Sequence, residues 1–242
     1  MLRKNNKQVR AVLFDLDDTL YDHRHSCRKG LTALKQKYDF IRNVSLDALE
    51  KDYLNLLNEI HLSKVLTGIY TIDEARNERM RILFSKYNGN TSDRILNEAR
   101  VIYSNAYMSS RRAVPGAKQL LKELKEHVKI GIVSNNFLKE QLEKIKQVGL
   151  ESYTDAVVVS EEVGVTKPNP EIFMLTLERL NCKANEAVMV GDSWEIDIIG
   201  AKNAGIRAVW FNRYGLTCPD ASLAKELDKF EAVEEALKII LG

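Results

Sequence analysis

Two patterns of apolar residues divide the chain. Between residues 21 and 112, apolar side chains recur every three or four positions, as in Leu31, Leu34 and Tyr38, and strand signals are nearly absent. This spacing is typical of amphipathic helices, because it places the apolar side chains on one helical face. We therefore predict a bundle of about four helices over this stretch.

The rest of the chain alternates between short apolar runs and helical periods. The runs, rich in Val and Ile, predict strands at 11–14, 128–133, 156–160, 187–190 and 206–211. The helical periods predict helices at 117–127, 137–148, 170–181, 194–204 and 221–240. Strands that are apolar without alternation suit a parallel sheet covered on both faces. We expect a doubly wound α/β core domain of residues 1–20 and 113–242, with a helical domain of residues 21–112 inserted after the first strand.

Polar and charged residues collect just after the predicted strands. Carboxylates follow the first and fourth strands, a hydroxyl and an amide follow the second, and an ammonium follows the third: Asp15, Asp17, Asp18 and Thr19; Ser134 and Asn135; Lys167; Asp192 and Asp197. Open α/β sheets bind ligands at the carboxyl ends of their strands. Asp15 and Asp17 would point to the same side if the strand continued. The set predicts Mg²⁺ held by carboxylate oxygens, and a tetrahedral oxyanion held by the hydroxyl, backbone N–H groups and the lysine.

Composition and charge argue against several classes of protein. Apolar residues make up 45% and charged residues 29%, as in ordinary soluble domains, and a formal charge of +2 gives no support to nucleic-acid binding. No apolar run approaches the roughly 18 residues that span a membrane. The basic residues 1–7 are not followed by the apolar region of a signal peptide. Three scattered cysteines without a CxxC pair indicate free thiols, so we expect a cytoplasmic protein. From the charge and the lack of a long apolar run, we expect no nucleic-acid or membrane partner. Monomer and homodimer both fit the sequence.

The residues at the strand ends resemble the four motifs of the haloacid dehalogenase-like (HAD) superfamily. The motifs are Asp15-Leu-Asp-Asp-Thr19, Ser134, Lys167 and Gly191-Asp-Ser-Trp-Glu-Ile-Asp197, in that order. The resemblance extends from about residue 10 to residue 215. The helical insert resembles the C1-type cap of subfamily I. The overall pattern of the chain is similar to the pyrimidine 5′-nucleotidase-like and N-acylneuraminate-9-phosphatase-like members of the superfamily. It implies a Mg²⁺-dependent phosphatase of small phosphorylated metabolites.

The resemblance also implies two different roles for the first two acids of the first motif. Asp15 would be the nucleophile that forms an aspartyl-phosphate, and it would also bind the metal. Asp17 would protonate the leaving group and then activate water, with only its backbone carbonyl on the metal. Asp18, which would point the other way along the chain, is expected to be a turn residue.

The remaining motif residues would hold the metal and the phosphate. Asp192 would bind the metal directly, and Asp197 either directly or through water. Lys167 would pair with Asp15 and with the phosphate. The expected substrate-binding set contains Thr19, Ser134, Asn135 and Lys167. Within it, the Asn135 contribution is its backbone N–H, and Thr19 is also expected to orient Asp17.

Other functions remain open from the sequence. True haloacid dehalogenases expel halide, which needs no proton, and they typically lack the second acid, so Asp17 favours phosphate chemistry. A phosphomutase on the same scaffold, or a non-catalytic phospho-acceptor or binding protein, stays as an alternative. A receiver-like phospho-acceptor leaves the helical insert of about 90 residues and Asp17 unexplained. Nucleoside monophosphates and sugar phosphates both fit as the substrate class.

Overall fold

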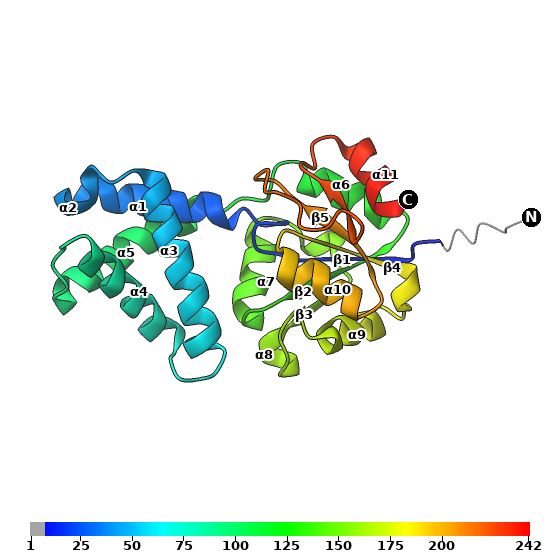
Figure 1. The fold of residues 1–242 in the computed structure, drawn as a ribbon, viewed down its shortest axis with the longest axis horizontal. Coiled ribbons are helices and arrows are strands. Elements are labelled where there is room, and N and C mark those ends of the chain that lie inside the picture. The colour runs from blue at the N-terminus through cyan, green and yellow to red at the C-terminus, as the bar shows by residue number, and fades with distance from the viewer. Residues whose placement is uncertain (1–7) are drawn as a thin grey trace, which may run out of the picture. The chain divides into compact units, whose positions relative to one another are not determined.

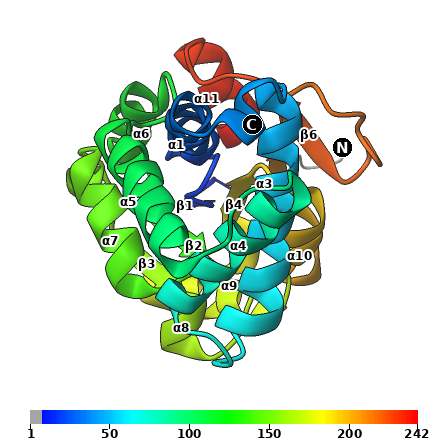
Figure 2. The same cartoon turned by 90° about the vertical axis from the view of Figure 1, so that its left-hand side faces the viewer.

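The computed structural model describes residues 8–242. The basic residues 1–7, in which we expect no signal peptide, lie outside the described residues. The chain forms two compact units: one contains the residues up to Asp22 together with Arg112–Gly242, and the other is His23–Arg111. The first unit contains a sheet and the second is helical (Figures 1 and 2). That the helical unit acts as a cap stays a prediction.

A six-stranded parallel sheet forms the centre of the first unit. Its strands are β1 (Ala11–Phe14), β2 (Lys129–Ser134), β3 (Ala156–Val159), β4 (Ala187–Gly191), β5 (Arg207–Phe211) and β6 (Ala224–Leu227). They lie in the order β3-β2-β1-β4-β5-β6, and every neighbouring pair is parallel. The doubly wound α/β prediction is therefore confirmed.

Helices cover this sheet on both faces (Figure 1). The longer ones are α6 (Ala117–Lys125), α7 (Leu138–Gln147), α9 (Pro170–Arg179) and α11 (Val233–Leu241), and the shorter ones are α8 (Ser160–Val163) and α10 (Ile199–Asn203). A π-helical turn, Trp194–Ile198, precedes α10. Phe173 and Leu177 of α9 and Ala201 of α10 pack with Leu13 of β1 in one buried cluster. Burial of these apolar side chains is the main stabilising contribution to such a domain.

β1 lies at the centre of the sheet because its four residues, Ala11 to Phe14, are all fully buried and have strands on both sides. Val12 is in register with Ile130 of β2 and with Val188 of β4. The strand order reverses between β1 and β4, since the chain builds outward on one side and then on the other. Doubly wound sheets bind their ligands at this point, beyond the carboxyl ends of the two strands.

The second unit consists of helices with a core of their own. They are α1 (His23–Lys37), α2 (Asp39–Arg42), α3 (Leu46–Ile60), α4 (Ile72–Lys86) and α5 (Asp93–Ser109), with a π-helical turn at His61–Val65. Leu31, Leu34, Leu49, Leu83 and Phe84 are among the buried residues of that core. Four of the helices are long, as the apolar period predicts.

One predicted element is wrong. The expected closing helix at 221–240 contains the sixth strand, β6, and only its second half is helical, as α11. In β6 the side chains of Lys225 and Glu226 are exposed and only Leu227 is buried. A short strand at the edge of a sheet has one solvated side, so it lacks the apolar run that identifies a central strand.

Two further expectations concern the cysteines and membrane-spanning segments. The three cysteines, Cys27, Cys182 and Cys218, are free. None of the helices within the described residues is long and apolar enough to cross a membrane.

Candidate active site

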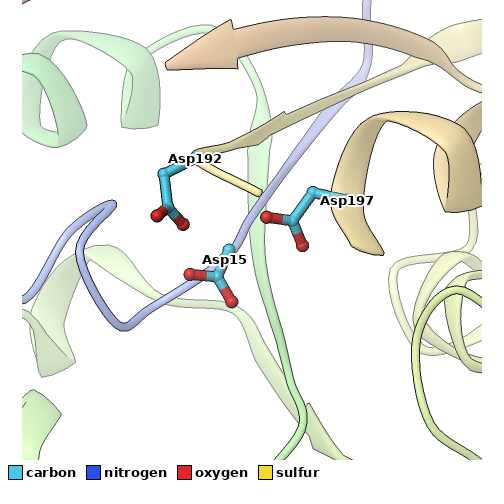
Figure 3. Close-up of side chains that lie close together, drawn as sticks. All are labelled: Asp15, Asp192 and Asp197. Carbon is cyan, nitrogen blue, oxygen red and sulfur yellow. The ribbon is translucent and has the colours of Figure 1, made fainter. Parts of the chain in front are cut away.

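Three carboxylates meet at the carboxyl ends of β1 and β4. Asp15 follows β1, Asp192 follows β4, and Asp197 lies in the π-helical turn after β4. Each offers one oxygen atom, and these oxygen atoms lie within 4.8 Å of one another. Figure 3 shows the three side chains arranged around a common space. The sequence predicted these three acids as metal ligands, and the structure brings them together.

Lys167 lies between two of these acids. Its Nζ donates to Asp15 Oδ1 at 2.6 Å and to Asp197 Oδ1 at 2.7 Å. The Lys167 side chain is only 2% exposed, so its charge is removed from water and depends on the two carboxylates for compensation. The ammonium thus holds Asp15 and Asp197 in fixed positions beside each other.

One ammonium does not compensate three carboxylates, of which Asp15 and Asp197 are buried and Asp192 is partly buried. Burial raises the pKa of Asp15 to about 7; the Lys167 charge opposes this increase and the Asp197 charge adds to it. Burial, followed by the charges of Asp15 and Asp197, raises the pKa of Asp192 well above its usual value. Both carboxyl groups therefore lie where additional positive charge would stabilise their ionised form.

The donor atoms fit a hard divalent cation. All three side chains offer carboxylate oxygens, which Mg²⁺ prefers, and the described residues bring no sulfur or imidazole into the cluster. Gly191 leaves room for the arrangement, because a Cβ at this position would overlap the Asp197 side chain. Ser193 N–H donates to Asp197 Oδ2 at 3.1 Å and fixes the orientation of that carboxylate.

Thr19 contacts Asp192, whereas we expected it to orient Asp17. Its hydroxyl donates to Asp192 Oδ1 at 3.4 Å and accepts a hydrogen bond from the Asp192 backbone N–H at 3.1 Å. Thr19 is fully buried. Its position therefore supports a role in holding one of the three acids, and its role as a substrate-binding residue stays a prediction.

Ser134 and Asn135 follow β2, as expected. The Ser134 Oγ accepts a hydrogen bond from Gln141 Nε2 at 2.5 Å, which leaves its own O–H available to donate. The Asn135 side chain is bound to the backbone of Lys167: its Nδ2 donates to the Lys167 carbonyl at 2.9 Å, and its Oδ1 accepts from the Lys167 N–H at 2.7 Å. The side chain of Asn135 therefore fixes the lysine loop.

Asp17 and Asp15 have different partners, because the strand does not continue through them as the shared-side expectation required. β1 ends at Phe14, and the Asp17 carboxylate is not part of the three-acid cluster. Lys144 Nζ donates to Asp17 Oδ1 at 2.7 Å and to Oδ2 at 2.8 Å, while Gln141 Nε2 donates to Oδ2 at 3.0 Å. The chain leaves the strand geometry after Asp15, so the alternation of side chains no longer holds.

The sequence analysis missed Gln141 and Lys144. They lie three residues apart on α7 and are therefore neighbours on the helix surface. Both are buried, on the face that also carries Ile145. A glutamine and a lysine on the apolar face of a helix are unusual, and this was the signal available in the sequence.

A second cluster of charges, also missed, lies where the chain leaves and re-enters the first unit. Asp22 is 1% exposed and accepts hydrogen bonds from Arg213 at 2.9 and 3.1 Å and from Arg112 Nε at 2.9 Å. The Asp22 backbone N–H also donates to the Arg112 carbonyl at 3.0 Å. This cluster ties both connecting segments to the loop after β5.

Comparisons with known proteins agree with this geometry. A family model described as haloacid dehalogenase-like hydrolase matches residues 9–205, well over half of the chain. The glyceraldehyde 3-phosphate phosphatase of Methanothermobacter thermautotrophicus is 32% identical over 209 residues, covering 84% of this chain and 86% of that protein. Ribulose-1,5-bisphosphate 5-phosphatase of Halopiger xanaduensis is 35% identical over 208 residues, covering 84% of each. Human N-acylneuraminate-9-phosphatase is 31% identical over 217 residues, covering 86% and 85%.

Solved structures share the fold. YfnB of Bacillus subtilis, described as a HAD-hydrolase bound to magnesium, has a TM-score of 0.74 at 26% identity and covers 96% of this chain and 100% of its own. L-2-haloacid dehalogenase of Xanthobacter autotrophicus has a TM-score of 0.70 at 19% identity, with 95% and 98% covered, and shows a common fold alone. Since the family match and the curated relatives both extend over most of the sequence, the chain is an enzyme of the haloacid dehalogenase-like hydrolase family.

Proposed function

We propose that this enzyme is a Mg²⁺-dependent phosphatase that hydrolyses small phosphorylated metabolites through an aspartyl-phosphate on Asp15. One observation carries the proposal. Asp15 accepts a hydrogen bond from a buried ammonium and clusters with two further acids, while a second acid of the same motif, Asp17, is held outside this cluster. Such an arrangement separates a nucleophile with its cation site from a group that exchanges protons.

The first half of the reaction forms the intermediate. A carboxylate oxygen of Asp15 attacks phosphorus, and the bond from phosphorus to the leaving oxygen breaks. The leaving oxygen keeps the electron pair and takes the proton of Asp17. In the second half, Asp17 removes a proton from water and the water oxygen attacks phosphorus. The bond between phosphorus and the Asp15 oxygen breaks, Asp15 keeps the electron pair as a carboxylate, and inorganic phosphate is released.

Asp15, Asp192 and Asp197 would hold the metal, Asp197 directly or through water, together with the backbone carbonyl of Asp17. When bound there, Mg²⁺ supplies positive charge that lowers the repulsion between an anionic phosphate and the attacking carboxylate. The raised pKa values of Asp15 and Asp192 support this assignment, because burial and, after it, neighbouring carboxylates disfavour the ionised forms that a cation would stabilise.

The chain also offers donors for the phosphoryl oxygens. The Ser134 hydroxyl can donate a hydrogen bond to a phosphoryl oxygen, because its oxygen accepts one from Gln141 Nε2. The Asn135 backbone N–H follows it at the end of β2, and the Asn135 side chain secures the loop of Lys167. These donors would stabilise charge that develops during phosphoryl transfer.

The related dehalogenase and phosphomutase chemistries fit less well. Halide is a leaving group that needs no proton, so a dehalogenase has no use for an acid held by two donors as Asp17 is held. The curated relatives are named phosphatases of small phosphorylated compounds, which favours hydrolysis over transfer. In this proposal the helical unit His23–Arg111 serves as the cap.

The test is hydrolysis of p-nitrophenyl phosphate and of a panel of sugar phosphates and nucleoside monophosphates. We expect wild-type turnover with Mg²⁺ that stops with EDTA, and a loss of at least about 10³-fold in Asp15→Asn. Asp228→Asn, which changes an exposed acid of the same unit, is the matched control and should keep wild-type activity. Absence of wild-type turnover on the whole panel, or full activity in Asp15→Asn, would overturn the proposal.

A further inference from the structure

Lys144 is a buried lysine whose charged end contacts Asp17. Lys144 is 5% exposed, and its Nζ lies 2.7 and 2.8 Å from the two Asp17 oxygens. The same ammonium lies over the Tyr21 ring, 5.3 Å from the centroid, and Tyr21 is fully buried. The ammonium therefore contacts both an aromatic face and a carboxylate.

Gln141 completes the contacts of Asp17. Its Nε2 donates to Asp17 Oδ2 at 3.0 Å and to Ser134 Oγ at 2.5 Å, and Gln141 is fully buried. One amide thus connects the acid of the first motif to the hydroxyl of the second. Donors on both Asp17 oxygens determine the plane of that carboxyl group as well as its position.

Stability alone gives little reason to place these side chains here. Burying a charge costs free energy that an ion pair offsets only with good geometry, and an apolar side chain on the same helical face would avoid that cost. The partner of Lys144 is Asp17, which lies outside the three-acid cluster and is the acid to which the proposed reaction assigns proton transfer. The buried position of Lys144 is therefore explained better by a role in placing the Asp17 carboxylate than by a role in stability.

We propose that Lys144, together with Gln141, is a positioning residue that holds the Asp17 carboxyl group in the orientation needed to exchange a proton with the leaving oxygen. This inference rests on the proposed phosphatase function. Lys144 contacts neither the reacting atoms nor the three-acid cluster in this assignment, and it acts through Asp17. A displacement of about 1 Å in a catalytic group can cost on the order of 10²-fold in rate.

The test compares two substrates with different leaving groups. An alkyl phosphate needs protonation of its leaving oxygen, whereas p-nitrophenyl phosphate leaves well without it. For Lys144→Met we expect kcat and kcat/KM on the alkyl phosphate to fall together by about 10²-fold with KM nearly unchanged. The loss of kcat/KM on p-nitrophenyl phosphate should be much smaller. Lys144→Arg, which restores a cationic donor, should recover part of the lost rate.

Two further variants make the test specific. Lys146→Met changes an exposed lysine of the same helix and should behave as wild type. In an Asp17→Asn background, Lys144→Met should cause no additional loss, because a residue that acts through Asp17 has nothing left to position. If Lys144→Met does not fold, Gln141→Leu and Lys144→Arg decide by the same substrate comparison.

The outcomes separate this inference from the proposed function. Equal losses on both substrates, a change in KM alone, or additive losses with Asp17→Asn would overturn the positioning role while leaving the phosphatase proposal intact. A wild-type enzyme that turns over neither substrate would instead overturn the proposed function, and the positioning role with it.

Discussion

At the scale of single residues, the site depends on a few side chains that hold other side chains. Lys167 fixes Asp15 and Asp197, Thr19 holds Asp192, and the amide of Asn135 holds the backbone of Lys167. Residues that orient metal ligands affect metal affinity even though they do not touch the metal. Substitution of such a residue should therefore change the metal dependence of the enzyme more than its substrate binding.

Thr19→Val tests this expectation. Valine keeps the volume and removes the hydroxyl, which leaves the Asp192 backbone N–H without its acceptor and the carboxylate without its donor. We expect the Mg²⁺ concentration for half-maximal activity to rise by about 10-fold, measured by Mg²⁺ titration of turnover and by calorimetry. Thr217→Val, at an exposed threonine of the same unit, is the control. A raised substrate KM with unchanged Mg²⁺ dependence would instead support Thr19 as a substrate-binding residue.

At the scale of structural elements, the segments that connect the two units are tied down by charge. Asp22 ends the first segment, Arg112 begins the second, and Arg213 follows β5. Tyr21 and Ala113 form an antiparallel bridge between the same two segments. Burial alone would raise the pKa of Asp22, but the hydrogen bonds and charges of Arg213 and Arg112 outweigh it and hold this pKa below its usual value of 3.8.

The lowered pKa of Asp22 predicts a pH dependence of stability. Its ionised form is favoured in the folded state, so its contribution is fully present above the unfolded pKa of 3.8 and is lost as pH falls through the lower folded pKa. Asp22→Asn should lower the free energy of unfolding by about 2 kcal/mol at pH 7. When denaturant unfolding is measured between pH 6 and roughly pH 3, the free energy of unfolding should therefore fall less with decreasing pH in the variant than in wild type. Parallel curves for the two proteins would contradict this role.

At the scale of the whole molecule, the chain has two units with separate hydrophobic cores, and the described candidate site lies entirely in one of them. The three acids of that site repel one another without a cation, so a bound divalent ion should stabilise the fold as well as the reaction. A ligand present at 100 times its dissociation constant stabilises a protein by about 2.7 kcal/mol.

Thermal unfolding tests this coupling. Mg²⁺ should raise the Tm of wild type by about 5 °C or more at saturation, given the size of the chain. Asp192→Asn removes one of the three acids; it should raise the Tm measured in EDTA, because repulsion is relieved, and should lose most of the Mg²⁺-induced increase. Asp228→Asn should show the wild-type increase. A wild-type Tm that does not respond to Mg²⁺ would argue against a cation site at these acids.

Local sequence was sufficient for most of the framework. The apolar run of β1 and the Val-rich and Ile-rich runs of β2 to β5 identify central parallel strands, since a strand buried on both faces tolerates few polar residues. The spacing of apolar residues likewise identifies the long helices of the inserted unit. The edge strand β6 was missed because it has one solvated side and only one buried residue.

The sequence by itself determined which acids, hydroxyl and lysine come after the strands, because the strands are specified by their own apolar residues; Lys167 comes later than the others, after the short helix α8 that follows β3. Only the tertiary structure decided how these side chains pair. Thr19 bonds to Asp192, which is 173 residues away, and Asp17 bonds to Lys144, which is 127 residues away. Such pairs depend on where parallel strands and their crossover helices bring distant segments together, and local propensity carries no information about that distance. The division of Asp15 and Asp17 between two sets of partners is therefore a property of the fold.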